Sequence, residues 1–96
     1  MILRFEWNGA KAVANLRKHG VGLDEASTVF DDALARIFDD EDHSTEQARE
    51  IIIGHSVTRR LLVVSFTEGK EGVVRIISAR TATRKERRDY EENVQQ

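Results

Sequence analysis

An arginine interrupts the most apolar run in the last third of the chain. Arg75 has two aliphatic residues on each side, and Arg80 follows five residues later. A guanidinium stays protonated at any workable pH, and its planar fork of five donors fits a phosphate or a carboxylate. Placing it in an apolar strand is costly unless it pairs with an acid, such as Glu68 or Glu50, or faces a cleft. We therefore expect Arg75 and Arg80 to be candidate phosphate-binding residues.

Candidates for proton transfer lie in other parts of the chain. Lys18 and His19 end a predicted helix, where they either stabilise the helix dipole or exchange a proton, as a near-neutral histidine does. Glu68, beside the hairpin that leads to the arginine-bearing strand, is an alternative base. Tyr90 is either the packing anchor of the last helix or an acid or base-stacking group. A base, an acid and a cation together could transfer protons and stabilise a developing negative charge.

A run of positive charge follows the arginine-bearing strand. Residues 75–88 contain six basic side chains and one acidic one, whereas residues 31–50 contain two basic and eight acidic ones. Such a run is typical either of a solvated surface or of a site that binds backbone phosphates. The candidate phosphate-binding residues outside the strand are Lys11, Arg84, Arg87 and Arg88.

Composition narrows the classes of protein to consider. The 96 residues predict one domain over residues 1–96, and an apolar content of 40% is typical of a globular protein. The chain has no cysteine, which excludes a disulfide framework and fits a reducing cytoplasm. No apolar run approaches the length of a membrane span, and no nucleotide-binding glycine motif is present. The acidic run Asp39–Asp42 with His43 lacks the ligand spacing of a calcium loop, so neither a metal nor a cofactor is predicted.

Two helices are predicted near the N-terminus, after a short strand over residues 2–7. Asn8 is a preferred N-cap residue and Gly20 a preferred C-cap residue, which predicts a first helix through about Lys18. A second, shorter helix is expected to begin near Leu23. Periodicity places Ala12, Val13 and Leu16 on the apolar side of the first helix, and Lys11, Asn15 and Lys18 on its polar stripe.

Four further strands are predicted, over residues 34–38, 50–55, 61–66 and 73–79. Their short connections favour an antiparallel meander. Strict alternation would place Arg75 and Arg80 on opposite faces, unless a bulge or the turn after the strand redirects Arg80. Thr83 and Glu86 match the capping box of a last helix. The expected fold class is α+β, with two N-terminal helices packed on a four- or five-stranded antiparallel sheet, followed by a C-terminal helix.

Short stretches from Phe5 to about Glu92 match one family in their order and spacing. They are Phe5-Glu6-Trp7, Asn15 to Val21, Glu25-Ala26, Val29 to Asp32, Ile53-Gly54, Arg60 to Val64, Arg75 to Arg80, Ala82-Thr83, Glu86 to Arg88 and Tyr90-Glu91. Through these stretches the chain resembles the BrnT family, the toxin components of type II toxin–antitoxin pairs.

The resemblance implies a fold similar to that of the RelE ribonucleases, and RNA cleavage that halts translation. It also implies a partner, a small BrnA-like antitoxin whose ribbon-helix-helix domain binds operator DNA, so that the two proteins form a hetero-oligomer. The chain would then be a metal-independent endoribonuclease, and the residues described above would be its catalytic and RNA-binding groups. The candidate catalytic residues are Lys18, His19, Glu68, Arg75, Arg80 and Tyr90, and the candidate RNA-binding residues are Lys11, Arg84, Arg87 and Arg88.

An alternative remains open from the residues alone. The chain is then a non-catalytic module that binds a protein or a nucleic acid through its basic C-terminal helix. The formal net charge of −2 supports this alternative, because a nuclease that acts alone on RNA is expected to be basic. Cleavage of RNA in EDTA distinguishes the two interpretations.

Overall fold

The structure, a computed structural model, describes residues 2–41 and 48–94 of the chain. The elements are β1 (Arg4–Glu6), α1 (Gly9–His19), α2 (Leu23–Ser27), a 3₁₀ helix η1 (Thr28–Asp31), β2 (Arg36–Asp39), β3 (Arg49–His55), β4 (Leu61–Glu68), β5 (Val73–Thr81) and α3 (Arg84–Val94). This order confirms the expected α+β fold, with two N-terminal helices, a sheet and a C-terminal helix.

The sheet has five strands in the order β1-β5-β4-β3-β2. Strands β2 to β5 form the predicted antiparallel meander. Strand β1 is the exception, because it pairs with β5 in the parallel direction. The two strands lie at opposite ends of the chain, so no short turn constrains their relative direction.

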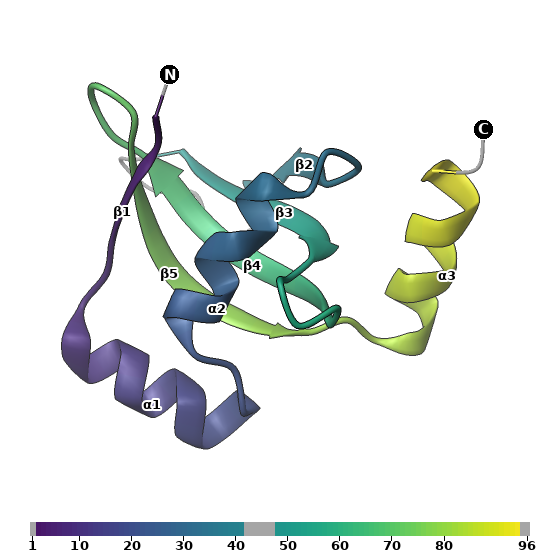
Figure 1. The fold of residues 1–96 in the computed structure, drawn as a ribbon, viewed down its shortest axis with the longest axis horizontal. Coiled ribbons are helices and arrows are strands. Elements are labelled where there is room, and N and C mark those ends of the chain that lie inside the picture. The colour runs from purple at the N-terminus through teal and green to yellow at the C-terminus, as the bar shows by residue number, and fades with distance from the viewer. Residues whose placement is uncertain (1, 42–47, 95–96) are drawn as a thin grey trace.

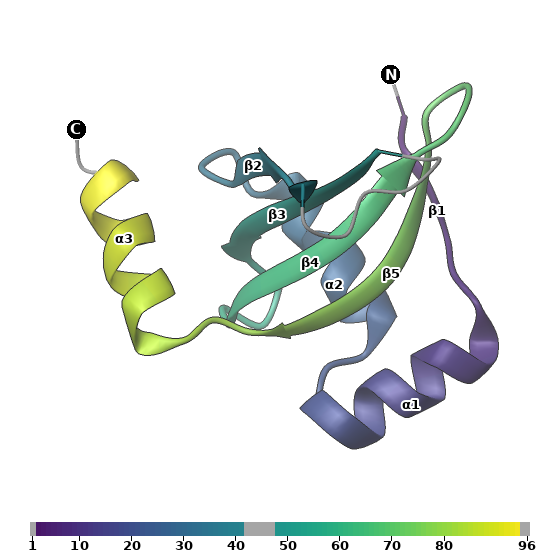
Figure 2. The same ribbon diagram turned by 180° about the vertical axis from the view of Figure 1, so that it is seen from behind.

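Helices cover one face of the sheet. Helix α1 contacts β5, and α2 with η1 contacts β5 and β3, as Figure 1 shows. The core between these layers consists of Val21, Leu23, Ala26, Val29, Ile52, Leu62, Val64, Phe66, Val74, Ile76 and Ala79. Seen from behind in Figure 2, the other face of β3, β4 and β5 has no helix over it in the described part of the chain.

A bulge in β5 sets the direction of the arginines. Ser65 pairs with Ser78, but Phe66 pairs with Ile76, which leaves Ile77 as an extra residue. The extra residue shifts the alternation by one position, so that Arg75 and Arg80 face the same side of the sheet. Of the two arrangements left open by the sequence, the bulged one is therefore present.

The orientation of α1 differs in part from the expectation, although Ala12 packs against the core as predicted. Val13 and Leu16, placed on the buried side by periodicity, are 59% and 55% exposed. Asn15, placed on the polar stripe, is instead buried against the end of β5. Its amide makes hydrogen bonds to backbone groups, which satisfies a polar side chain inside the protein. Periodicity could not detect this, because two of the three hydrogen bonds join Asn15 to the backbone of Ala79, 64 residues away.

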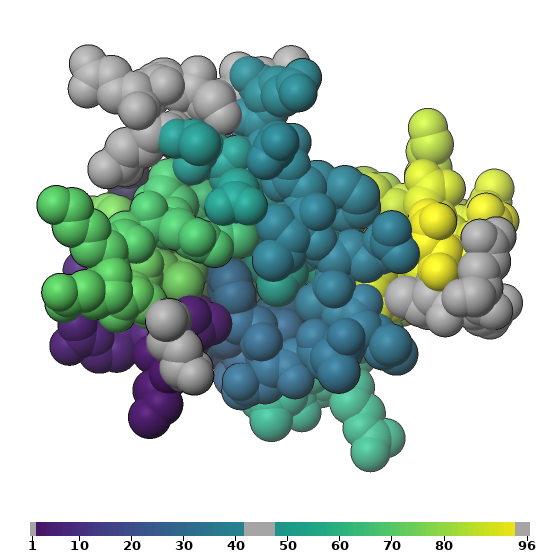
Figure 3. All heavy atoms as spheres, turned by 90° about the horizontal axis from the view of Figure 1, so that it is seen from above, coloured from purple at the N-terminus to yellow at the C-terminus, as the bar shows by residue number. Residues whose placement is uncertain are grey.

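Helix α3 stands at one end of the molecule, away from α1 and α2 (Figures 1 and 3). Its start is the predicted capping box, in which the Glu86 backbone N–H donates to the Thr83 hydroxyl and the Thr83 N–H donates to the Glu86 carboxylate. Tyr90 anchors the helix, since its side chain is buried and its ring packs against His55. No helix within the described ranges is long and apolar enough to cross a membrane.

Candidate nucleic-acid interface

Arginines frame the face of the sheet that the helices leave open. Residues that pair across neighbouring strands lie on the same face, so the register defines rows across it. The rows are Arg36–Ile53–Val63–Arg80, Phe38–Ile51–Ser65–Ser78, and Arg49–Thr67–Arg75–Glu6. We call this surface, with Arg36, Arg49, Arg75 and Arg80, the arginine face.

A hollow of about 460 Å³ lies on the arginine face. It is lined by His19, Asp40, Arg49, Ile51, Val63, Ser65, Ser78, Ala79 and Arg80. His19 comes from the end of α1 and Arg80 from the end of β5. Two candidates from distant parts of the sequence, a proton carrier and a phosphate-binding cation, therefore line the same hollow.

Sequence reasoning missed several residues of this hollow. Arg49, Ser65 and Ser78 add a second guanidinium and two hydroxyls to its wall. Strand alternation could have linked Ser65 to the arginines, but only with the register of β4 and β5 and the position of the bulge known. These are non-local properties of the sheet.

The amide of Asn15 fixes α1 to the end of β5. Its Nδ2 donates to the carbonyl oxygens of Val21 and Ala79, each at 2.9 Å, and its Oδ1 accepts from the Ala79 N–H at 3.1 Å. Asn15 lies one helical turn before His19, and Ala79 directly precedes Arg80. This contact therefore sets the position of the histidine relative to the arginine.

A second contact holds the other side of the α1 terminus. Arg60 donates from Nε to the Glu25 carboxylate at 2.9 Å, and from one terminal nitrogen, Nη2, to the same carboxylate and to the Gly20 carbonyl. Ser56 and Thr58 donate their hydroxyls to the same carboxylate. Arg60, and then these hydroxyls, lower the pKa of Glu25 to about 2 against the opposing effect of burial. The residue that follows His19 is thus fixed to the turn between β3 and β4.

Arg80 is engaged in the capping box of α3. Its two terminal nitrogens donate to the two carboxylate oxygens of Glu86 at 2.7 and 2.9 Å. This is the bidentate geometry in which a guanidinium also binds a phosphate. The guanidinium lowers the pKa of Glu86 to about 2, and the carboxylate raises the pKa of Arg80. Arg80 therefore lines the hollow while paired with a carboxylate of α3.

Arg75 is paired with a different acid from those expected. It lies 3.3 Å from Glu6 on β1, and both side chains are about half exposed. An exposed pair of this kind contributes little to stability, because water and salt screen it. Glu68 and Glu50 were the expected partners, but their strand positions place them on the other face, with Val74 and Phe66.

Glu68 is consequently separated from the arginine face. It pairs in register with Val74, a core residue, at the end of β4. Burial, followed by the nearby charges of Glu68 and Asp39, raises the pKa of Glu50. This effect is consistent with Glu68 lying beside Glu50, on the helix-covered side.

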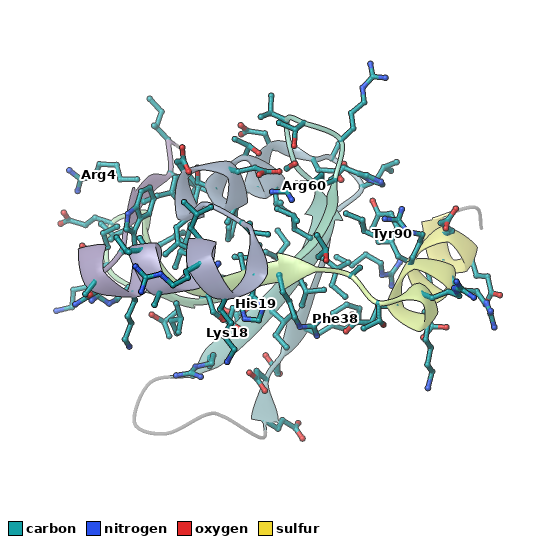
Figure 4. The ribbon with its side chains drawn as sticks, turned by 90° about the horizontal axis from the view of Figure 1, so that it is seen from below. Arg4, Lys18, His19, Phe38, Arg60 and Tyr90 are labelled. Carbon is teal, nitrogen blue, oxygen red and sulfur yellow. The ribbon has the colours of Figure 1, made fainter. Side chains whose placement is uncertain are left out.

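Tyr90 also lies apart from the hollow. Its hydroxyl donates to Asp32 at 3.3 Å, and its ring contacts His55. Burial and the Asp32 carboxylate raise the pKa of Tyr90. In Figure 4, Tyr90 lies at α3, whereas His19 lies below α1, on the side of β5 away from Arg60.

The remaining candidates lie on two other surfaces. Lys11 and Lys18 are exposed on α1, outside the lining of the hollow. A separate hollow of about 320 Å³ on α3 is lined by Arg84, Arg87, Arg88, Glu91 and Glu92. In the described ranges, no three His, Cys, Asp or Glu side chains are grouped as metal ligands. Asp42 and His43 of the acidic run lie outside those ranges.

The sequence and the fold of the chain were compared with those of known proteins. No curated protein matches the chain. A 1.1 Å crystal structure of the Brucella abortus ribonuclease toxin BrnT matches with a TM-score of 0.66 and 20% sequence identity, over 86% of this chain and all of that one. The family described as "Ribonuclease toxin, BrnT, of type II toxin-antitoxin system" matches residues 7–86. The chain therefore belongs to the BrnT family of ribonuclease toxins.

Proposed function

We propose that the chain is a metal-independent endoribonuclease and that the hollow on the arginine face binds the scissile phosphodiester. The observation that carries the proposal is that His19 and Arg80 line one hollow although they come from opposite ends of the chain. RNA contains its own nucleophile, the 2′-hydroxyl, so cleavage needs only proton transfer and stabilisation of the pentacovalent phosphate.

The roles follow from what each side chain can exchange. Neutral His19 accepts the 2′-hydroxyl proton while the 2′-oxygen bonds to phosphorus and the bond from phosphorus to the 5′-oxygen breaks. The 5′-oxygen takes a proton, either from the histidine or from Lys18 beside it. The products are a 2′,3′-cyclic phosphate and a 5′-hydroxyl. Arg80 and Arg49 keep their protons and therefore act as cations that stabilise the phosphate.

Other arginines extend the contact with the substrate. Arg75 lies on the same face as Arg80 and can bind a neighbouring phosphate. On α3, Arg84, Arg87 and Arg88 would bind the backbone further away, in the salt-dependent manner of cationic surfaces. Lys11 is exposed on α1 and would add to the same attraction. Glu68 receives no catalytic role in this proposal, because it lies on the face opposite the arginines. Tyr90 receives none either, because its hydroxyl donates to Asp32.

A type II toxin is paired with an antitoxin protein, and we propose a ribbon-helix-helix partner that forms a hetero-oligomer with this chain and carries it to operator DNA. Cleavage of cellular RNA would inhibit translation until the partner binds. Co-expression with the product of a neighbouring short reading frame, followed by size-exclusion chromatography, tests the association. Recovery of the chain alone would contradict it.

The direct test is cleavage of RNA by the purified chain in EDTA. Wild-type protein is expected to give cyclic-phosphate ends, and Arg80→Ala and His19→Ala to reduce the rate by about 100-fold or more. Arg17→Ala removes an exposed positive charge of α1 that lies outside the lining of the hollow, and it should cleave as the wild type does. Undiminished cleavage by Arg80→Ala or His19→Ala would refute the assigned roles. Retained RNA binding without any cleavage would favour the binding module.

A further inference from the structure

Phe38 differs from every other aromatic residue of the chain. Phe30 packs against both Phe5 and Phe66, Trp7 packs against the core, and the Tyr90 side chain of α3 is buried. Phe38 is 46% exposed, on an edge strand whose other residues are also exposed. Single exposed apolar side chains are common on protein surfaces, so this ring is informative only through where it lies relative to the hollow.

The register places Phe38 beside the hollow. It is the cross-strand partner of Ile51, and its row continues through Ser65 to Ser78. The last three residues of this row line the hollow. Neighbouring strands are about 4.8 Å apart, so the ring stands next to the wall of the hollow, on the same face of the sheet. Figure 4 shows Phe38 and His19 on the same side of β5, away from Arg60.

A cation accompanies the ring. Arg36 lies two residues before Phe38 on β2, so the two side chains project from the same face, and both are exposed. Arg36 also begins the row that ends at Arg80. An aromatic ring beside a line of cations is the combination by which proteins bind single-stranded nucleic acid, since the ring stacks on a base and the cations bind phosphates.

We propose that Phe38 and Arg36 form a nucleotide subsite at the β2 edge of the arginine face. Phe38 stacks on the base of a nucleotide next to the one whose phosphate lies in the hollow, and Arg36 contacts its phosphate. The subsite rests on the proposed function for its substrate, single-stranded RNA. Stacking tolerates all four bases, so this subsite contributes affinity and register rather than base identity.

The test is RNA binding in a His19→Ala background, in which the expected loss of about 100-fold or more in rate keeps the RNA intact during the measurement. Fluorescence anisotropy with a labelled single-stranded oligonucleotide is expected to show weaker binding for Phe38→Ala, by about 5- to 100-fold, and near-normal binding for Phe38→Trp. Ile37→Ala is the matched control, because Ile37 is 53% exposed on the opposite face of the same strand. Arg36→Ala should reduce the slope of log affinity against log salt by about one.

Each result decides a separate point. Equal binding by Phe38→Ala and Ile37→Ala overturns the subsite, as does a Phe38→Ala protein that binds RNA normally but no longer associates with the antitoxin. Cleavage by the wild type together with unchanged binding by Phe38→Ala removes the subsite and leaves the proposed function intact. RNA binding that depends on Phe38 in a chain that never cleaves RNA supports the subsite and removes the nuclease activity.

Discussion

Replacing Asn15 by alanine should destabilise the protein strongly, although the residue resembles a surface polar residue in the sequence. Asn15 is 7% exposed and satisfies the carbonyls of Val21 and Ala79 and the N–H of Ala79, both residues being at most 1% exposed. Each buried group left without a partner costs about 1–3 kcal/mol. The summed cost of these groups is reduced, because water can partly enter the site and because alanine has a better helix propensity than asparagine. We expect a loss of about 3 kcal/mol, a large part of the stability of a domain of this size.

Urea unfolding followed by circular dichroism measures this loss. A change of about 3 kcal/mol should also lower the Tm by more than about 10 °C in a domain of this length. Arg17→Ala is the control, because Arg17 is exposed on the same helix and should change stability by less than about 0.5 kcal/mol. If Asn15→Ala were as stable as Arg17→Ala, the amide would not hold α1 to β5, and the positioning of His19 would need another explanation.

Three further predictions follow from the contacts of single residues. The pKa of Glu25 falls from 4.5 to about 2 on folding, so its ionised form stabilises the fold above pH 4.5, and this stability is lost as the pH falls toward 2. Glu25→Gln should therefore flatten the acid-unfolding curve over that range, as followed by circular dichroism. Gly54→Ala should lower the Tm measured by calorimetry, because the added Cβ would lie 2.8 Å from the Ala35 Cβ. Glu86→Gln keeps a capping-box side chain but removes the negative charge that pairs with the Arg80 guanidinium, and should tighten RNA binding several-fold at low salt, as measured by anisotropy.

One result would contradict each of these predictions. An acid-unfolding curve of Glu25→Gln identical to that of the wild type would mean that the carboxylate is not stabilised by Arg60. An unchanged Tm for Gly54→Ala would mean that the chain around Ala35 yields easily; Gly9→Ala is the control, since an added Cβ there meets no atom within 4 Å. Weaker RNA binding by Glu86→Gln would mean that the carboxylate orients Arg80 for the substrate rather than competing with it.

Local patterns in the sequence predicted the elements well. Capping residues marked the ends of α1 and the start of α3, and runs of branched aliphatic residues marked β3, β4 and β5. These signals are local because each depends on a residue and its near neighbours in the chain. The fold class followed from their order.

The errors share a physical cause. Asn15 was placed on the solvent side because two of its three hydrogen bonds are to backbone atoms of Ala79, 64 residues away. The direction of β1 and the ion pair between Arg75 and Glu6 depend on which strands lie side by side. Such information is not local, and no short window of sequence contains it.

The site was predictable only in part for the same reason. His19 and Arg80 could be selected by residue type, and strand alternation left the face of Arg80 open until the bulge at Ile77 was known. Arg49 and Phe38 carry no signal of their own, since each is an ordinary strand residue until the register brings it to the arginine face. Glu68 also could not be placed from its residue type, because alternation along β4 turns it to the face opposite the arginines.

The central claim is that His19 and Arg80 act on one phosphate, and a double-mutant cycle tests it most directly. Single-turnover cleavage of one RNA in EDTA would be measured for the wild type, His19→Ala, Arg80→Ala and the double variant. Groups that act as a unit on the same bond give non-additive losses, so the double variant should be little slower than the slower single variant. Losses that multiply independently would contradict the claim and place the two residues in separate steps or sites.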